Sequence, residues 1–130
     1  MRIFVYWNVL MSSAAHLEVQ RACRLFKALG DETRLRIVAL LSHGELCVCH
    51  LESALGLTQS NTSRQLGVLR AAGVVEPRRE GSWVYYRLAP QLDEVCKQQL
   101  EALVGTFGKR ETLRQDVEQL LKVRGPDSCR

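Results

Sequence analysis

The stretch ELCVCHLESALGLTQSNTSRQLGVLRAA, residues 45–72, decides the fold of this chain. Apolar residues such as Leu51 and Leu55 recur at helical spacing, and Gly56 is placed to end that helix. Thr58 is then placed to cap a second helix. The stretch therefore predicts two helices joined by a short turn, which is typical of a helix-turn-helix.

The second helix of this stretch divides into two faces when each residue is turned by about 100°. Thr62, Leu66 and Leu69 fall on one face, which we expect to pack against the core. The opposite face carries short hydroxyl groups, small residues and an arginine, so it can enter a major groove closely and bond to base edges. We interpret it as a recognition helix with DNA contacts from Gln59, Ser60, Ser63 and Arg64.

A β-hairpin is predicted after the recognition helix. Residues 74–79 lead into a turn at 80–82, and apolar and polar residues alternate over 83–88. The hairpin is basic, and we expect Arg78 and Arg79 to meet phosphates beside the groove, which adds affinity without sequence information. The alternative is a charged turn that only faces water.

Apolar periodicity predicts four further helices, at 17–29, 31–42, 92–107 and 113–121. Asp31 is placed to cap the second of these, whose Arg34 and Arg36 we expect to face water. Cys23 and Cys96 lie in two of the apolar stripes. We interpret both as small buried core residues, with a metal or redox thiol as the alternative.

Composition narrows the class of protein. The 130 residues allow one domain with a modest core, and a net charge of +4 with a pI near 9.0 favours polyanionic partners. Five unevenly spaced cysteines differ from a secreted disulfide framework and indicate a reducing cytoplasm.

The first ten residues are too short to span a membrane, so no membrane partner is expected. Phosphate-binding loops, nucleophile motifs and a Cys-x-x-Cys motif are missing, which argues against an enzyme.

Three segments together resemble the ArsR/SmtB family of winged-helix, metal-responsive repressors. They are ELCVCHL at 45–51, SRQL at 63–66 and GSWVYYRL at 81–88, and the similarity covers roughly residues 19–103. The most specific segment is Cys47-Val48-Cys49, which looks like the metalloid site of the arsenic repressors and half of the cadmium/lead site of their relatives. The arsenic-repressor pattern usually carries a third cysteine three residues after the second, where this chain has Glu52.

The resemblance also implies a homodimer on double-stranded operator DNA. In the family the first and the 92–107 helices pair across a twofold axis, so we expect a charge at Leu100 to split the dimer. The expected fold is mostly α-helical with a small β-hairpin, a dimeric winged helix-turn-helix. We assign residues 1–15 to a poorly ordered extension, 16–108 to DNA binding and dimerisation, and 109–130 to a short helix and tail.

Metal chemistry is expected at Cys47 and Cys49. Soft thiolates suit As(III) or Sb(III) as inducer, and also Cd(II), Pb(II) or Zn(II); the alternative is a buried pair of inert thiols. Helical residues two apart point about 200° from each other, so we expect chelation to require the helix start near Cys49 to be non-helical or to uncoil. The third ligand stays open among Cys23, Cys96, Cys129 and a small cellular thiol, although we expect Cys129 to be dispensable.

Three functions follow from these observations. The leading one is a DNA-binding transcriptional repressor that As(III), Sb(III) or a related soft metal releases from its operator. The second is a winged-helix repressor that senses thiol redox state or persulfide through Cys47 or Cys49 with Cys23 or Cys96. The third is an architectural winged helix with inert cysteines.

Overall fold

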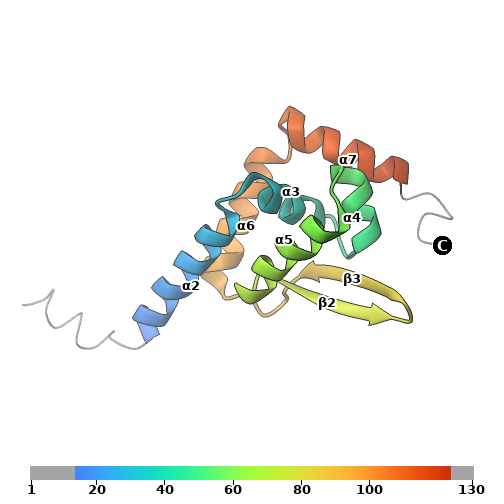
Figure 1. Ribbon diagram of the computed structural model, residues 1–130. Helices are drawn as coiled ribbons and strands as arrows, with labels where there is room; N and C mark the ends of the chain where they lie inside the picture. Colours follow the sequence, from blue (N-terminus) through green and yellow to red (C-terminus); the bar gives the residue numbers. More distant parts are fainter. Residues whose placement is uncertain (1–13, 124–130) are drawn as a thin grey trace, which may run out of the picture.

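The computed structural model describes residues 14–123 and is mostly helical, with a three-stranded antiparallel sheet (Figure 1). Residues 1–13 of the expected extension and Cys129 lie outside the described residues. The helices and strands in chain order are α2 (Ala14–Leu29), α3 (Glu32–Leu41), β1 (Leu46–Cys47), α4 (Val48–Leu55), α5 (Gln59–Ala71), β2 (Val75–Glu80), β3 (Trp83–Leu88), α6 (Glu94–Phe107) and α7 (Glu111–Val123).

The predicted capping residues fix the ends of the central helices. A side-chain oxygen of Asp31 accepts the Arg34 amide at 3.1 Å at the start of α3. The Thr58 hydroxyl accepts the Asn61 amide at 3.2 Å at the start of α5. Gly56 ends α4 in the left-handed conformation, φ 65°, where a side chain would be strained. The predicted helix-turn-helix of α4 and α5 is therefore confirmed.

The sheet has the order β1-β3-β2. The hairpin of β2 and β3 is confirmed. The strand β1 was not predicted: Leu46 and Cys47 pair with Tyr86 and Tyr85 of β3. The hairpin and the segment that precedes α4 are therefore one sheet.

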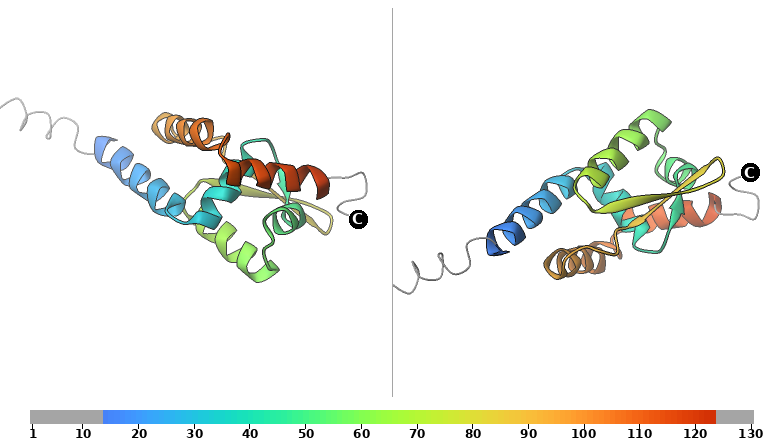
Figure 2. Two further views of the ribbon diagram at one scale, coloured as in Figure 1. Left: turned by 90° about the horizontal axis from the view of Figure 1, so that it is seen from above. Right: turned by 90° about the horizontal axis from the view of Figure 1, so that it is seen from below.

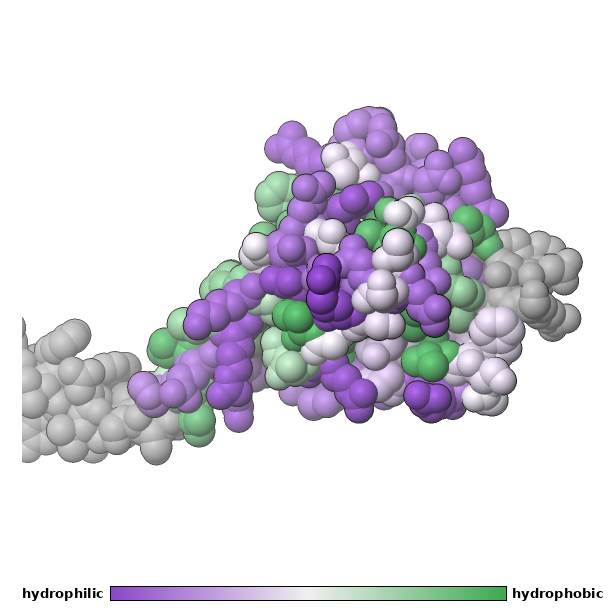
Figure 3. Space-filling view, in the orientation of Figure 1, coloured by the Kyte–Doolittle hydropathy of each residue, from purple (hydrophilic) through white to green (hydrophobic). Residues whose placement is uncertain are grey.

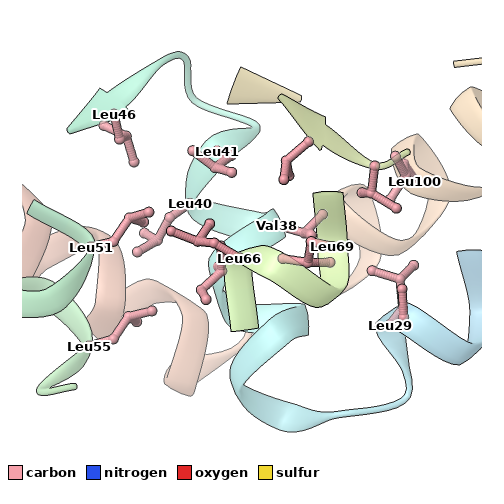
Figure 4. Close-up of a cluster of buried hydrophobic side chains, with 14 of the residues drawn as sticks. Leu29, Val38, Leu40, Leu41, Leu46, Leu51, Leu55, Leu66, Leu69 and Leu100 are labelled. Carbon is pink, nitrogen blue, oxygen red and sulfur yellow. The ribbon is translucent and has the colours of Figure 1, made fainter. Parts of the chain in front are cut away.

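Leucines from most of the elements build the core (Figure 4). Leu51 of α4, Leu66 of α5 and Leu120 of α7 are all buried in it. Leu100 of α6 is also only 4% exposed within the single chain. A charge at Leu100 would therefore disrupt the core of the subunit, so its expected effect is unfolding before any effect on a dimer surface.

Two arginines of α3 hold neighbouring helices instead of facing water, which corrects the prediction for both. Arg34 donates to the Ala28 carbonyl at 2.5 Å and to the Gln65 side-chain oxygen at 3.0 Å, so it joins α2 and α5 to α3. Arg36 bonds to the carboxylate of Asp116 in α7. Helix α7 packs on both α3 and α4.

The helices α2 and α6 contact each other and extend from one side of the molecule (Figure 2). Cys96 is buried, as predicted, whereas Cys23 is exposed and the prediction of a buried residue there is wrong. Five large apolar side chains on these two helices are 40–60% exposed: Leu17, Val19, Phe26, Val95 and Phe107. Figure 3 shows hydrophobic surface along α2. None of the described helices has the length and apolar character of a membrane span.

Candidate functional site

Cys47 and Cys49 lie at the junction of β1 and α4. Cys47 is buried and extended (φ −67°, ψ 143°) at the N-cap of α4, whereas Cys49 is the second helical residue. Their sulfur atoms are 2.9 Å apart. The expected non-helical segment is present at Cys47 and not at Cys49: because Cys47 lies outside the helix, the 200° separation does not apply, and the helical Cys49 need not uncoil.

The sulfur atoms are already close to the spacing that one ion requires. Two sulfurs bound at about 2.3 Å to a tetrahedral ion lie about 3.8 Å apart, so chelation would open this pair by about 1 Å. Cys23, Cys47 and Cys96 are free, whereas Cys49 is disulfide-bonded in this structure. The pair can therefore act as two thiols only after reduction of Cys49.

The thiol pair opens into a cavity of about 370 Å³. Helix α5, the predicted recognition helix, contributes Gln59 and Ser63 to its wall, and the hairpin contributes Arg79, Trp83 and Tyr86. Trp83 and Tyr86 were not predicted as site residues, although their place in the strand next to the tip was a usable signal. The thiol site thus lies between the two elements predicted to touch DNA.

The recognition helix α5 has the two predicted faces. Thr62, Leu66 and Leu69 are buried. The four residues predicted to contact DNA are all exposed, and they lie in the first six residues of α5: Gln59, Ser60, Ser63 and Arg64. The Arg64 guanidinium donates to the Asn61 side-chain oxygen at 3.0 Å, which holds it along the helix surface.

The two predicted hairpin arginines differ in their surroundings. Arg78 is paired with Glu45 and Glu80, and its guanidinium lies 4.8 Å from the centre of the Tyr85 ring. The hydrogen bonds to Glu45 and Glu80 raise the pKa of Arg78, and the bonds from Arg78 lower the pKa of Glu45. Arg79 is exposed, and no carboxylate among residues 14–123 pairs with it. Arg79 is therefore the better placed of the two for a phosphate.

Cys96 has a different environment from the thiol pair. Burial raises the pKa of its thiol to about 11, and a hydrogen bond to Asp93 adds to the effect. The thiol is therefore protonated at neutral pH, and a protonated thiol is a poor metal ligand. Cys96 does not line the 370 Å³ cavity.

Comparisons with known proteins show which family this chain resembles. Residues 31–76 match the family described as "Bacterial regulatory protein, arsR family". The chain is 42% identical over 110 residues to the arsenic resistance transcriptional regulator ArsR1 of Pseudomonas putida, covering 81% of this chain and 84% of that protein. It is 54% identical over 70 residues to the arsenical resistance operon repressor of Escherichia coli, covering 53% and 60%. A homodimeric winged helix-turn-helix DNA-binding domain from Mycobacterium bovis superposes with a TM-score of 0.61 at 33% identity, covering 74% and 85%.

Proposed function

Because this chain belongs to the ArsR family of bacterial regulatory proteins and is a transcriptional repressor, not an enzyme, we propose that As(III) or Sb(III) is its inducer. The metalloid binds the reduced thiols of Cys47 and Cys49, and its binding releases operator DNA. Cd(II), Pb(II) and Zn(II) are further candidate ions, since thiolates bind all of them. The protein acts in the cytoplasm, where its DNA lies and thiols stay reduced.

The observation that carries this proposal is the sulfur pair, 2.9 Å apart, in a cavity walled by the recognition helix and the hairpin. An ion between the sulfurs pushes them about 1 Å apart and lies against side chains of α5 and the hairpin. Suppose that the protein changes between a DNA-binding and a released conformation. To move their populations from 99:1 to 1:99, the ligand must bind the released conformation more tightly by about 5.5 kcal/mol. The metalloid therefore releases the DNA if it binds the released state more tightly than the DNA-bound state by about this amount.

A homodimer completes the proposed repressor. Large apolar side chains of α2 and α6 are exposed in the single chain, and the two helices contact each other, so they offer a surface for a partner. A twofold partner on this surface would bury them and present two α5 helices to the DNA. Twofold helix-turn-helix dimers read half-sites about one helical turn apart, so we expect a palindromic operator.

A band-shift titration on the DNA upstream of the chain's own gene tests the proposal. The fully reduced protein should bind a palindromic segment, and arsenite or antimonite should release it at concentrations far below those needed for Zn(II). Retention of the complex at saturating arsenite, with the thiols shown to be reduced, would contradict the proposal.

A second function is a thiol-redox or persulfide-sensing repressor, which the disulfide on Cys49 favours. In that case peroxide or polysulfide releases the DNA, and arsenite does not. Counting the reactive thiols before and after each reagent separates the two functions. An inert architectural winged helix would respond to none of them.

A further inference from the structure

A chain of side-chain hydrogen bonds runs from the end of α2 to the exposed face of α5. The Arg34 guanidinium donates from Nε to the Ala28 carbonyl at 2.5 Å and from Nη1 to the side-chain oxygen of Gln65 at 3.0 Å. Gln65 in turn donates from Nε2 to the side-chain oxygen of Asn61 at 3.2 Å. The same Asn61 oxygen accepts a bond of 3.0 Å from Nη2 of Arg64. The chain of bonds therefore ends on a residue that is predicted to contact DNA.

The inner part of this chain of bonds is shielded from water. Gln65 is 8% exposed, and the Arg34 side chain is 17% exposed. Asn61 is half-buried, whereas Arg64 is exposed. Residues three and four apart in a helix are neighbours, so Arg64 and Gln65 both reach the side chain of Asn61. Because a hydrogen bond is electrostatically stronger away from water, the bond from Gln65 fixes Asn61 more firmly than an exposed bond would.

The direction of each bond follows from Arg34. A guanidinium has only donors, so the Gln65 atom that faces it must be the oxygen, and the NH₂ group of Gln65 must face Asn61. Asn61 therefore turns its own oxygen toward Gln65, and this oxygen is also the acceptor for Arg64. The network assigns the orientation of both amides in this way. A residue of α3 thus determines which atom of Asn61 is offered to Arg64.

Arg64 keeps its capacity to contact a base while Asn61 holds it. A guanidinium carries several N–H donors, and the bond to Asn61 uses only one of those on Nη2. The remaining donors are sufficient for a bidentate contact with the O6 and N7 atoms of guanine. An arginine that is already ordered loses less conformational freedom on binding, so it binds the correct base more tightly. At a wrong base, where Arg64 makes no contact, this advantage is absent, and discrimination between base pairs is therefore increased.

We propose that Gln65 is a positioning residue for operator recognition. It connects Arg34 to Asn61, and in this way it holds Arg64 in the conformation that reads a base pair. This inference rests on the proposed function, because it requires an operator that α5 contacts. It adds a buried residue and its partner Asn61 to the exposed residues that are predicted to determine sequence preference.

The substitution Gln65→Glu separates this role from a purely structural one. A glutamate still accepts from Arg34, now with charge assistance, so the protein should keep its melting temperature. A carboxylate has no hydrogen to donate, so Asn61 must turn its NH₂ group toward residue 65 and its oxygen away from Arg64. Gln65→Glu should therefore weaken base discrimination in a folded protein. If Gln65 only joined α5 to α3, the variant would keep both stability and discrimination.

The measurement uses the palindromic segment found in the band-shift titration and copies of it that each have one base pair changed. Arg64→Ala identifies the base pair that Arg64 reads, because discrimination there is lost. At that base pair, Gln65→Glu and Asn61→Ala should each lower the ratio of affinities for the correct and the changed DNA by about 3- to 10-fold. The ratios at other base pairs should stay the same, since an added negative charge weakens binding to all the DNAs alike. Gln115→Glu, the same substitution on the exposed surface of α7, is the matched control and should leave every ratio unchanged.

The outcomes separate this inference from the proposed function. A folded Gln65→Glu protein that keeps the parent's ratio at the base pair read by Arg64 would overturn the inference and leave the function intact. An equal loss at every base pair would also overturn it, because a general disturbance of α5 affects all contacts. So would an Arg64→Ala protein with every ratio unchanged, since Arg64 would then read no base.

Two further results complete the test. Circular dichroism melts show whether each variant is folded, and if Gln65→Glu unfolds, Asn61→Ala decides in the same way, because it removes the acceptor of Arg64 at a half-buried position. A parent chain that prefers no DNA segment would disprove the proposed function, and the inference with it.

Discussion

The guanidinium of Arg36 in α3 donates two hydrogen bonds to the carboxylate of Asp116 in α7, from Nε to Oδ2 at 2.8 Å and from Nη2 to Oδ1 at 2.7 Å. The Asp116 side chain is 5% exposed and that of Arg36 is 25% exposed. The pair connects residues 80 positions apart in the sequence. It anchors α7 on α3.

Arg36→Ala should therefore destabilise the protein by about 3 kcal/mol or more, because it leaves the Asp116 carboxylate buried without a partner. Asp116→Ala should cost less, since Arg36 is partly solvated. The double variant Arg36→Met, Asp116→Leu removes both charges and should recover most of the loss. Urea unfolding of the four proteins measures these differences. If Arg36→Ala lowers the free energy of unfolding by less than about 1 kcal/mol, the prediction is wrong and water already solvates the ion pair.

The thiol pair should be needed for the response to arsenite and not for binding to DNA. Cys47→Ser and Cys49→Ser should each bind the operator as the parent does, because serine is close in size and neither residue lies on the exposed face of α5. Each variant should fail to release DNA with arsenite, as measured by fluorescence anisotropy of labelled operator. If both variants release DNA at the parent's arsenite concentration, the sensing site lies elsewhere.

The recognition helix and the hairpin should contribute differently to DNA binding. Arg64→Ala and Ser63→Ala should abolish the preference for operator over random DNA, with little change in the salt dependence. Arg79→Ala should weaken binding to both DNAs and reduce the slope of log affinity against log salt by about one. Arg78→Ala is the matched comparison: its charge is already neutralised by Glu45 and Glu80, so the slope should change less. Full operator preference in Arg64→Ala would mean that the reading face is misassigned.

The proposed dimer surface can be tested at a residue that the subunit itself leaves uncovered. Phe26 is 51% exposed in the single chain, so Phe26→Glu should keep the subunit folded and split the dimer in sedimentation. Leu100→Glu, in contrast, should unfold the chain, which circular dichroism would detect. A Phe26→Glu protein that sediments as a dimer at micromolar concentration would exclude this interface.

The N-cap of α6 should make stability depend on pH in the acid range. The Cys96 amide donates to Asp93 at 2.9 Å, and this bond, with a smaller effect of Arg21, lowers the pKa of Asp93. The pKa of Asp93 is thus lower in the folded protein than in the unfolded protein, where it is about 3.9. The charged carboxylate therefore stabilises the fold at pH values above about 3.9, and this stabilisation is lost as the pH falls through the pKa of Asp93 in the folded protein. Asp93→Asn keeps a capping oxygen, so its melting temperature should fall less steeply than the parent's below pH 4. Asp93→Ala should cost about 1 kcal/mol at pH 7. Parallel pH profiles for the parent and Asp93→Asn would contradict this origin.

Local patterns in the sequence were sufficient for the helices and for the buried and exposed faces of α5. Thr58 and Gly56 define the turn through their own backbone chemistry, and the division of α5 into buried and exposed faces follows from helical period alone. A two-residue strand has no period, so β1 could not be recognised without knowledge of its partner Tyr86.

Long-range contacts explain the predictions that were wrong. Arg34 and Arg36 look like solvent-facing residues in a helical projection, but their partners lie 31 and 80 residues further along the chain. The exposure of Cys23 depends on which face of α2 is covered by α6. The convergence of Cys47 with Cys49 depends on one residue, because Cys47 is extended and caps the helix instead of joining it.

The pairing of Cys47 with Tyr85 gives the thiol site and the hairpin a common register. A strand that slips by one residue turns every side chain to the opposite face of its sheet. An insertion or deletion between Glu45 and Cys47 would therefore point the Cys47 sulfur away from the cavity even though the Cys-x-Cys spacing stayed intact. Grafting this sensor onto another winged helix thus requires the strand, its pairing partner and the start of α4 as one unit, because the two cysteines alone do not specify the site.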